Sequence, residues 1–142
     1  MNLNYYDTFI TVSPDSTAEV GMIPQERKGG PSKHGIEFEL ISGSPYTYTQ
    51  EDVLFEVHVR HKGLEQEVLE ERREQLREEF FSRSHACMRA SALPKKYGWG
   101  LHFDKEGKVA LYGVESPEYR ALAANATGDL KVVPGMRSSR GK

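Results

Sequence analysis

Cys87, the only cysteine of this 142-residue chain, is its strongest potential nucleophile. A thiol becomes reactive at neutral pH when a neighbouring base accepts its proton, and His85 or His102 could act as that base. Nothing in the local spacing enforces either pairing, and a cysteine among Ala and Met residues is more often a small buried hydrophobic side chain. An enzyme that uses Cys87 with a histidine is therefore kept as an alternative function.

A cation, an imidazole and a phenol form the favoured candidate site, at Arg89, His102 and Tyr112. His102 and Tyr112 share one face of a predicted hairpin, and Arg89 joins them if the segment before the hairpin pairs alongside as a strand. Arginine binds a carboxylate or phosphate through two hydrogen bonds, and the other two side chains add one each. The three residues are expected to hold a small anionic ligand or a protein segment in a non-enzymatic binding or regulatory module. The alternative is an ordinary hydrogen-bonded cluster beneath the last helix.

Metal and cofactor signals are weak. His58 and His61 have the spacing that places two imidazoles on one face of a helix, but two ligands do not make a metal site and the sequence fixes no third. The glycine runs at 29–31 and 98–100 lack the Gly-Lys-Ser/Thr that completes a phosphate-binding loop. No metal and no cofactor are expected.

The basic C-terminal end is a second alternative. Lys131, Arg137, Arg140 and Lys142 gather there without a recognised nucleic-acid motif. Four cations provide only modest attraction that salt weakens, so nucleic-acid binding through this end is not favoured.

The candidate site depends on a β-hairpin over residues 99–114. Its turn runs through Lys105 and Glu106, with Gly107 in the left-handed conformation. Antiparallel strands step in opposite directions, which pairs Phe103 with Val109, His102 with Ala110, Leu101 with Leu111, Gly100 with Tyr112 and Trp99 with Gly113. One face is then bulky and turned inward, with Gly113 leaving room for the indole of Trp99. The other face is low and open beside His102 and Tyr112, a shape that admits a ligand, a loop or a packed helix.

Three helices are predicted before the hairpin. Residues 36–41 fit a helix capped by Ser32 better than a strand. Residues 50–62 follow a capping box at Thr49 and Asp52, with Glu56 placed to pair with Arg60, and a strand is the open alternative. Residues 64–83 carry an apolar stripe on a charged background, which Arg72 interrupts. The charged face is expected to be solvated, and a homodimer contact is the alternative.

Shorter elements complete the expected fold. Strands are predicted for residues 5–12, 86–90 and 130–133, a surface loop for 16–35, and a helix from Pro117 to about Asn125. Together they predict an α+β fold in which three to four helices pack on a C-terminal antiparallel sheet. One globular domain is expected over residues 1–134, followed by a flexible basic tail over 135–142.

Composition limits the class of protein. At 37% hydrophobic and 28% charged residues, with no apolar run near the roughly 18 needed to cross a bilayer, no membrane span is expected. The first residues lack a secretory signal and the lone cysteine fits a reducing compartment, so the expected location is the cytoplasm. Residues 1–84 carry a net charge of −7 and residues 85–142 one of +5, an asymmetry that can orient a polar partner.

Four segments carry a resemblance to a known family: YYDTFITVSPDS, SPYTYTQEDVLFEVHVR, EEFFSRSHACMRAS and KKYGWGLHFDKEGKVALYGVES. Together they resemble a family of small bacterial proteins that is a domain of unknown function. The resemblance covers nearly the whole chain and is most specific at YGWG and KVALYGVES. It implies a bacterial cytoplasmic protein and assigns no reaction, cofactor or site residue.

Overall fold

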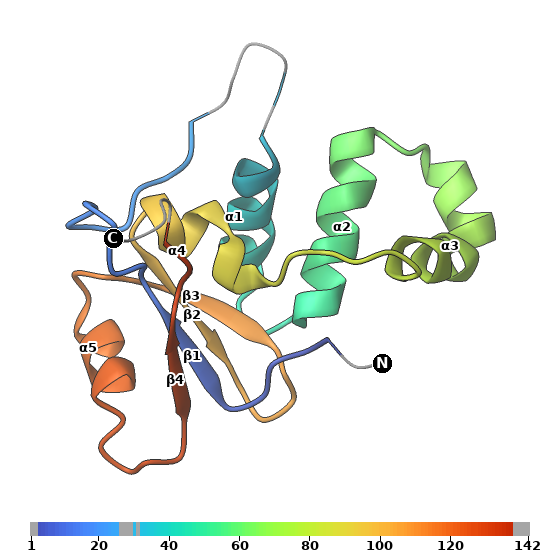
Figure 1. The fold of residues 1–142 in the computed structure, drawn as a ribbon. Helices are drawn as coiled ribbons and strands as arrows, with labels where there is room; N and C mark the ends of the chain where they lie inside the picture. The colour runs from blue at the N-terminus through green and yellow to red at the C-terminus, as the bar shows by residue number, and fades with distance from the viewer. Residues whose placement is uncertain (1–2, 26–29, 31, 138–142) are drawn as a thin grey trace.

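Four strands form one sheet in the computed structural model, which describes residues 3–25, 30 and 32–137 (Figure 1). They are β1 (Thr8–Thr11), β2 (Trp99–Phe103), β3 (Val109–Gly113) and β4 (Lys131–Pro134), in the order β3-β2-β1-β4. β2 is antiparallel to β1 and β3, whereas β4 is parallel to β1. The prediction of a purely antiparallel sheet is therefore wrong. The chain crosses from β3 to the far edge through a helix, and such a crossover brings in the next strand in the same direction.

The predicted hairpin is confirmed in its register. Five pairs join β2 to β3, from Trp99 with Gly113 to Phe103 with Val109, and Gly107 has a φ of +82°. Leu101, Phe103 and Val109 are fully buried on the inward face. A slip of one residue would turn these side chains to the opposite face, so burial itself holds the register.

The expected strand at 86–90 is not formed. This segment is instead the 3-10 turn η1 (Met88–Ala90), followed by the short helix α4 (Ala92–Lys96). The hydroxyl of Ser91 accepts a hydrogen bond from the N–H of Leu93 at 3.1 Å, which starts the helix and leaves no extended run to join the sheet. Pro94 lies within this helix.

The other helices are confirmed as helices. They are α1 (Lys33–Gly43), α2 (Gln50–Lys62), α3 (Gln66–Phe81) and α5 (Pro117–Ala124). Ser32 caps α1 through the N–H of Gly35 at 3.1 Å, and Thr49 and Asp52 form the predicted capping box of α2. The strand alternative for residues 50–62 is excluded. Four side chains of α2 that would have formed one strand face are buried, and they divide between two clusters.

The elements form layers in a single α+β domain (Figure 1). α1, α2 and η1 cover one face of the sheet, where Ile41, Val53 and Met88 join Ile10 and strands β2 and β3 in the main core. α5 packs on β1 and β3. α3 lies beyond α2 and encloses a second cluster around Phe55, Val59 and Leu69.

Ion pairs hold α3 against α2. Arg73 pairs with Glu56, and Arg77 lies 3.1 Å from a carboxylate oxygen of Asp52. The expected pairing of Glu56 with Arg60 is thus replaced by a contact between helices. Arg72 has non-helical angles (φ −127°, ψ 19°) and bends α3 at the position where it interrupts the apolar stripe.

The chain stays hydrogen-bonded to the domain just beyond residue 134. The N–H of Gly135 donates to Thr11 and that of Met136 to Arg89, both at 2.8 Å. Residues 138–142, most of the expected tail, lie outside the described residues, so the tail boundary stays a prediction. Among the described residues, every helix is too short or too polar to cross a bilayer.

Candidate functional site

His102 and Tyr112 are brought together by a third residue, Tyr46. The hydroxyl of Tyr46 lies 2.7 Å from Nδ1 of His102 and 2.8 Å from the hydroxyl of Tyr112. Tyr46 reaches this position because residues 46–48 pair with the edge of β3, where its N–H donates to Val109 at 2.9 Å. Its φ of +55° is a left-handed conformation that is unfavourable for a residue with a Cβ atom.

Burial keeps this cluster largely neutral. It lowers the pKa of His102, and the nearby carboxylates of Asp104 and Asp7 oppose that shift. Burial also raises the pKa of Tyr46, together with the hydrogen bond to Tyr112. The three polar groups therefore satisfy one another, as the alternative of an ordinary hydrogen-bonded cluster expected.

The glycine-lined surface beside His102 is filled. A Cβ atom on Gly100 would lie 2.6 Å from the ring of Phe9 and 2.7 Å from that of Tyr119. Phe9 comes from β1 and Tyr119 from α5, so the low surface admits a packed helix. The indole of Trp99 is accommodated by Gly21, where a Cβ atom would lie 2.8 Å from the ring, and not by Gly113, which the carboxylate of Glu115 covers.

Arg89 lies in a different part of the molecule. Its Nε donates to the carbonyl of Pro134 at 2.8 Å, at the end of the edge strand β4. It follows Met88, which packs in the main core on the face of the sheet opposite His102. Because residues 86–90 form no strand, the structure does not bring Arg89 to His102 and Tyr112.

A separate cleft gathers more titratable groups. It encloses about 380 Å³ between α1, α2 and the segment 85–92. Its polar lining residues are Lys33, His34, Glu37, His58, His85, Cys87 and Ser91, and its apolar ones are Leu54, Val57, Phe80, Ala86, Met88, Ala90 and Ala92. A neighbouring hollow of about 390 Å³ shares His58, Phe80 and His85 with it and adds Arg83.

Glu37 is the most perturbed group of the cleft. It lies on α1 with only 9% of its surface exposed, and one carboxyl oxygen accepts a hydrogen bond from the hydroxyl of Ser91. Burial raises its pKa to about 7, and the bond from Ser91 opposes the shift. Within the described residues Glu37 forms no ion pair. Its carboxyl group is consequently partly protonated at neutral pH.

Imidazoles and aromatic rings form the opposite wall. Phe80 stacks on His85 with ring centroids 3.8 Å apart and lies 4.7 Å from the ring of His58. Burial lowers the pKa of His58, and the positive charges of Lys62, His85 and Lys33 lower it further. The neutral form of His58 is thus favoured in this cleft.

Cys87 lines the same cleft as His85, but the structure shows no hydrogen bond between them. Tyr5 donates its hydroxyl to the sulfur of Cys87 at 3.3 Å, and burial followed by this contact raises the pKa of Tyr5 to about 12. The Nε2 of His85 lies 2.5 Å from the carbonyl of Phe80, which can only accept, so Nε2 carries the proton. His102, the other candidate partner of Cys87, lies on the opposite face of the sheet and does not line the cleft.

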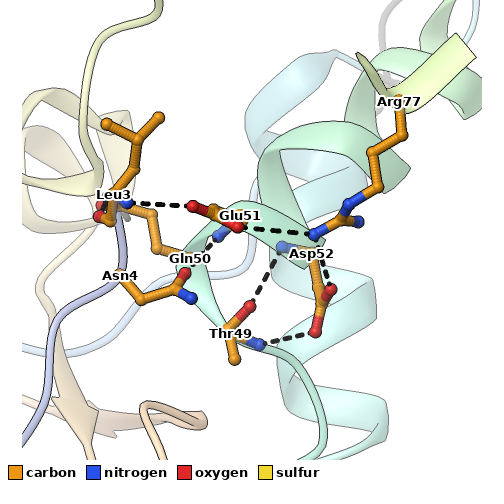
Figure 2. Close-up of polar contacts among 7 residues, drawn as sticks. All are labelled: Leu3, Asn4, Thr49, Gln50, Glu51, Asp52 and Arg77. Atoms are coloured by element: carbon orange, nitrogen blue, oxygen red, sulfur yellow. Dashed lines mark hydrogen bonds and ion pairs between the residues drawn. The ribbon is translucent and has the colours of Figure 1, made fainter. Parts of the chain in front are cut away.

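Polar contacts fix the wall that carries Cys87. The buried amide of Gln50 donates to the carbonyl of Leu3 and accepts from the N–H of Met88 at 2.7 Å. Figure 2 shows Gln50 beside the capping box of α2. The carboxylate of Glu51 accepts a hydrogen bond from the N–H of Leu3 and forms an ion pair with Arg77 of α3. The N-terminal segment and α3 therefore both contact the first turn of α2.

The family comparison agrees with the sequence resemblance. Residues 1–141 match a family described as a family of unknown function, DUF6157. The chain belongs to this family. No curated protein and no solved structure matches the chain. For this DUF6157 member the side chains of the cleft define the chemistry that is available.

The cleft contains groups that can exchange protons. Among the residues that the structure describes, no three His, Cys, Asp or Glu side chains converge as ligands. His58 and His61 do lie on one helix, but His58 packs against Phe80 and His61 is exposed. The lining instead offers hydrogen-bond donors, positive charge and one protonatable carboxyl group in this DUF6157 protein.

Sequence reasoning missed Glu37 and Tyr46. Glu37 stands between Ile36 and Phe38, where a helix of this pattern predicts burial on one side, and a charged residue beside that face is the available signal. Tyr46 follows Pro45 in a short connection between helices, and nothing in the sequence places it over the hairpin.

Proposed function

We propose that this protein is a non-enzymatic binding module that holds a small anionic ligand in the cleft between α1, α2 and residues 85–92. The proposal keeps the ligand class expected from the sequence and moves the site away from Arg89, His102 and Tyr112. The observation that supports it is the lining: Lys33 and three histidines surround a pocket whose buried carboxyl group is partly protonated. Perturbed titratable groups in a cleft are a recognised mark of a functional site.

Charge favours an anion over a cation. Lys33 is exposed at the rim, and burial lowers the pKa of His58, with a further lowering from the positive charges of Lys62, His85 and Lys33. Binding an anion relieves that repulsion and favours protonation of the imidazoles. A cation would meet the same repulsion, and only Glu37 would oppose it.

Size limits the ligand to a small molecule. About 380 Å³ falls at the low end of the range for small-molecule pockets. Val57, Met88 and Phe80 offer apolar contact, so the ligand carries an apolar part beside its anionic group.

A thermal-shift screen with small carboxylates and phosphates tests the proposal. We expect stabilisation of the wild type that is lost in Lys33→Ala and His58→Ala. Arg89→Ala and His102→Ala are the matched controls, because they remove the residues first predicted from the sequence. Ligands that still stabilise Lys33→Ala and His58→Ala but no longer stabilise the two controls would place the site at Arg89 and His102.

A Cys87-dependent enzyme is the second candidate, favoured by the presence of Cys87 and His85 in one cleft. Reaction of folded protein with a thiol reagent at pH 7 tests it. Labelling faster than that of a free thiol, with the excess rate lost in His85→Gln, would support it, and a Cys87 that reacts no faster than a free thiol or stays unreactive would remove it.

We also infer a bacterial, cytoplasmic protein. The resemblance to small bacterial proteins supports the source, and the free thiol of Cys87 fits a reducing compartment.

A further inference from the structure

Glu37 presents a buried acid without a counter-charge. Its carboxyl group lines the cleft, its hydrogen bond comes from the neutral hydroxyl of Ser91, and no cation pairs with it among the described side chains. Buried carboxylates are normally paired with a cation or else take up a proton. In this cleft no described cation pairs with Glu37, so its carboxyl group takes up a proton.

A protonated carboxyl group changes what the site can hold. In that form Glu37 is a hydrogen-bond donor, and it can donate to an anionic oxygen that a charged carboxylate would repel. Such an O–H to O⁻ hydrogen bond is among the strong, short ones. The ammonium group of Lys33 at the rim would balance the charge of the ligand.

We propose that the ligand is a small monocarboxylate with an apolar body, and that it binds together with one proton held between its carboxylate and Glu37. This inference rests on the proposed function and names the ligand class of the same cleft. The proton comes from solvent, no covalent bond changes, and the Ser91 hydroxyl continues to donate to the other oxygen of Glu37.

The lining favours a carboxylate over a phosphate. A single shared proton neutralises one of the two carboxyl groups, so the pair carries one negative charge, which Lys33 can balance. A phosphate carries more charge and more acceptor oxygens, whereas half of the lining residues are apolar, Leu54, Val57 and Ala92 among them. A planar apolar body would instead lie against these side chains and Phe80.

Other titratable groups face the same space, and the experiment must separate them from Glu37. They are Lys33 and His34 on α1, His58 on α2, and His85 and Cys87 on the segment before α4. His34, His58 and His85 are common to the wild type and to Glu37→Gln, so a difference in pH dependence between these two proteins belongs to Glu37. Cys87→Ser removes the thiol from the comparison.

Calorimetric titration of the full chain with benzoate, and separately with inorganic phosphate, tests the proposal. We expect benzoate to bind with an affinity that falls about tenfold between pH 7.5 and 8.5, because one proton accompanies it. Repeating the titration at pH 8 in two buffers of different ionisation enthalpy should show uptake of close to one proton. Cys87→Ser should still take up close to one proton with benzoate, because Glu37 is the group that shares it.

Glu37→Gln is the decisive variant, because the amide can still accept from Ser91 and donate to the ligand but carries no titratable proton. We expect it to bind benzoate with no proton uptake and with an affinity that stays flat over the same window. Glu39→Gln, an exposed site on the same helix, is the matched control and should keep the wild-type dependence.

The outcomes separate this inference from the proposed function. Phosphate binding without proton uptake would contradict the shared proton but leave the proposed anion site in place. Benzoate binding that stays pH-dependent in Glu37→Gln would do the same. Failure of both probes to bind the wild type at millimolar concentration would overturn both.

Discussion

Gln50 accepts a hydrogen bond from the backbone N–H of Met88 at 2.7 Å, across 38 residues of chain. The same side chain donates to the carbonyl of Leu3, and it is 2% exposed. One buried amide thus satisfies two backbone groups from distant segments at the first residue of α2. This side chain adds a polar attachment between α2 and the wall of the cleft that includes Cys87 and Met88.

Gln50→Leu tests that attachment. Leucine fills similar volume but leaves the N–H of Met88 and the carbonyl of Leu3 unpaired, and each buried unpaired group costs about 1–3 kcal/mol. We expect the free energy of unfolding in urea to fall by about 2–4 kcal/mol in total. Gln66→Ala, at an exposed position on α3, should change it by less than about 0.5 kcal/mol. Equal effects from the two variants would contradict the anchoring role.

Gly100→Ala tests how closely Phe9 and Tyr119 cover the sheet. The added methyl group would lie 2.6–2.7 Å from both rings, so one of them must move. Overpacking of this kind typically costs about 1–3 kcal/mol. Gly43→Ala is the control, because a Cβ atom there meets nothing within 4 Å and alanine favours a helix. Thermal unfolding should show Gly100→Ala melting well below the wild type and Gly43→Ala at or above it; unchanged melting of Gly100→Ala would show that the surface is open.

The hairpin was predictable because local rules decide it. Turn chemistry at Gly107 and the alternation of bulky side chains from Trp99 to Phe103 both point to one register. The helix starts at Ser32, Thr49 and Ser116 were predictable for the same reason, since a cap needs only residues within one turn.

The candidate site was not predictable in this way, because it depends on contacts across the whole chain. Residues 86–90 alternate like a strand, yet Gln50 and the cap at Ser91 hold them as a turn. As a result, Arg89 donates a hydrogen bond to the carbonyl of Pro134. Glu37 meets Ser91 across 54 residues, a separation that no local pattern can reveal.

His102 provides a test of the cluster with Tyr46. Its folded-state pKa is lowered, mainly by burial, so the unfolded chain binds more protons as the pH falls below about 6.5. The contribution of His102 to stability is therefore present above pH 6.5 and is lost as the pH falls toward the folded-state pKa. NMR titration of the His102 ring should give a midpoint below 6.5.

Tyr46→Phe extends this test. It removes the hydroxyl that contacts both Nδ1 of His102 and the hydroxyl of Tyr112. We expect a loss of about 1 kcal/mol of stability at pH 8 and a measurable change in the His102 midpoint. Tyr6→Phe, an exposed tyrosine, is the control. An ordinary His102 midpoint in the wild type would argue against the buried cluster.

Glu37 should make the protein less stable at high pH. Its pKa rises from 4.5 in the unfolded chain to about 7 in the fold, so the folded state holds a proton that the unfolded state releases. Stability from this group is full below about pH 4.5, declines as the pH rises to about 7, and stays low above that. Glu37→Gln should flatten this decline and be more stable than the wild type at pH 8. A wild type that gains stability between pH 5 and 8 by the same amount as Glu37→Gln would contradict the assignment.

The carboxyl carbon of Glu37, followed by ¹³C NMR over a pH titration with and without benzoate, tests the account most directly. We predict a midpoint near 7 in the free protein, and a higher midpoint when benzoate is bound, since the ligand's charge favours the protonated acid. A midpoint near 4.5 that benzoate does not move would mean that this carboxyl group is an ordinary solvated one, and that the cleft holds no anion beside it.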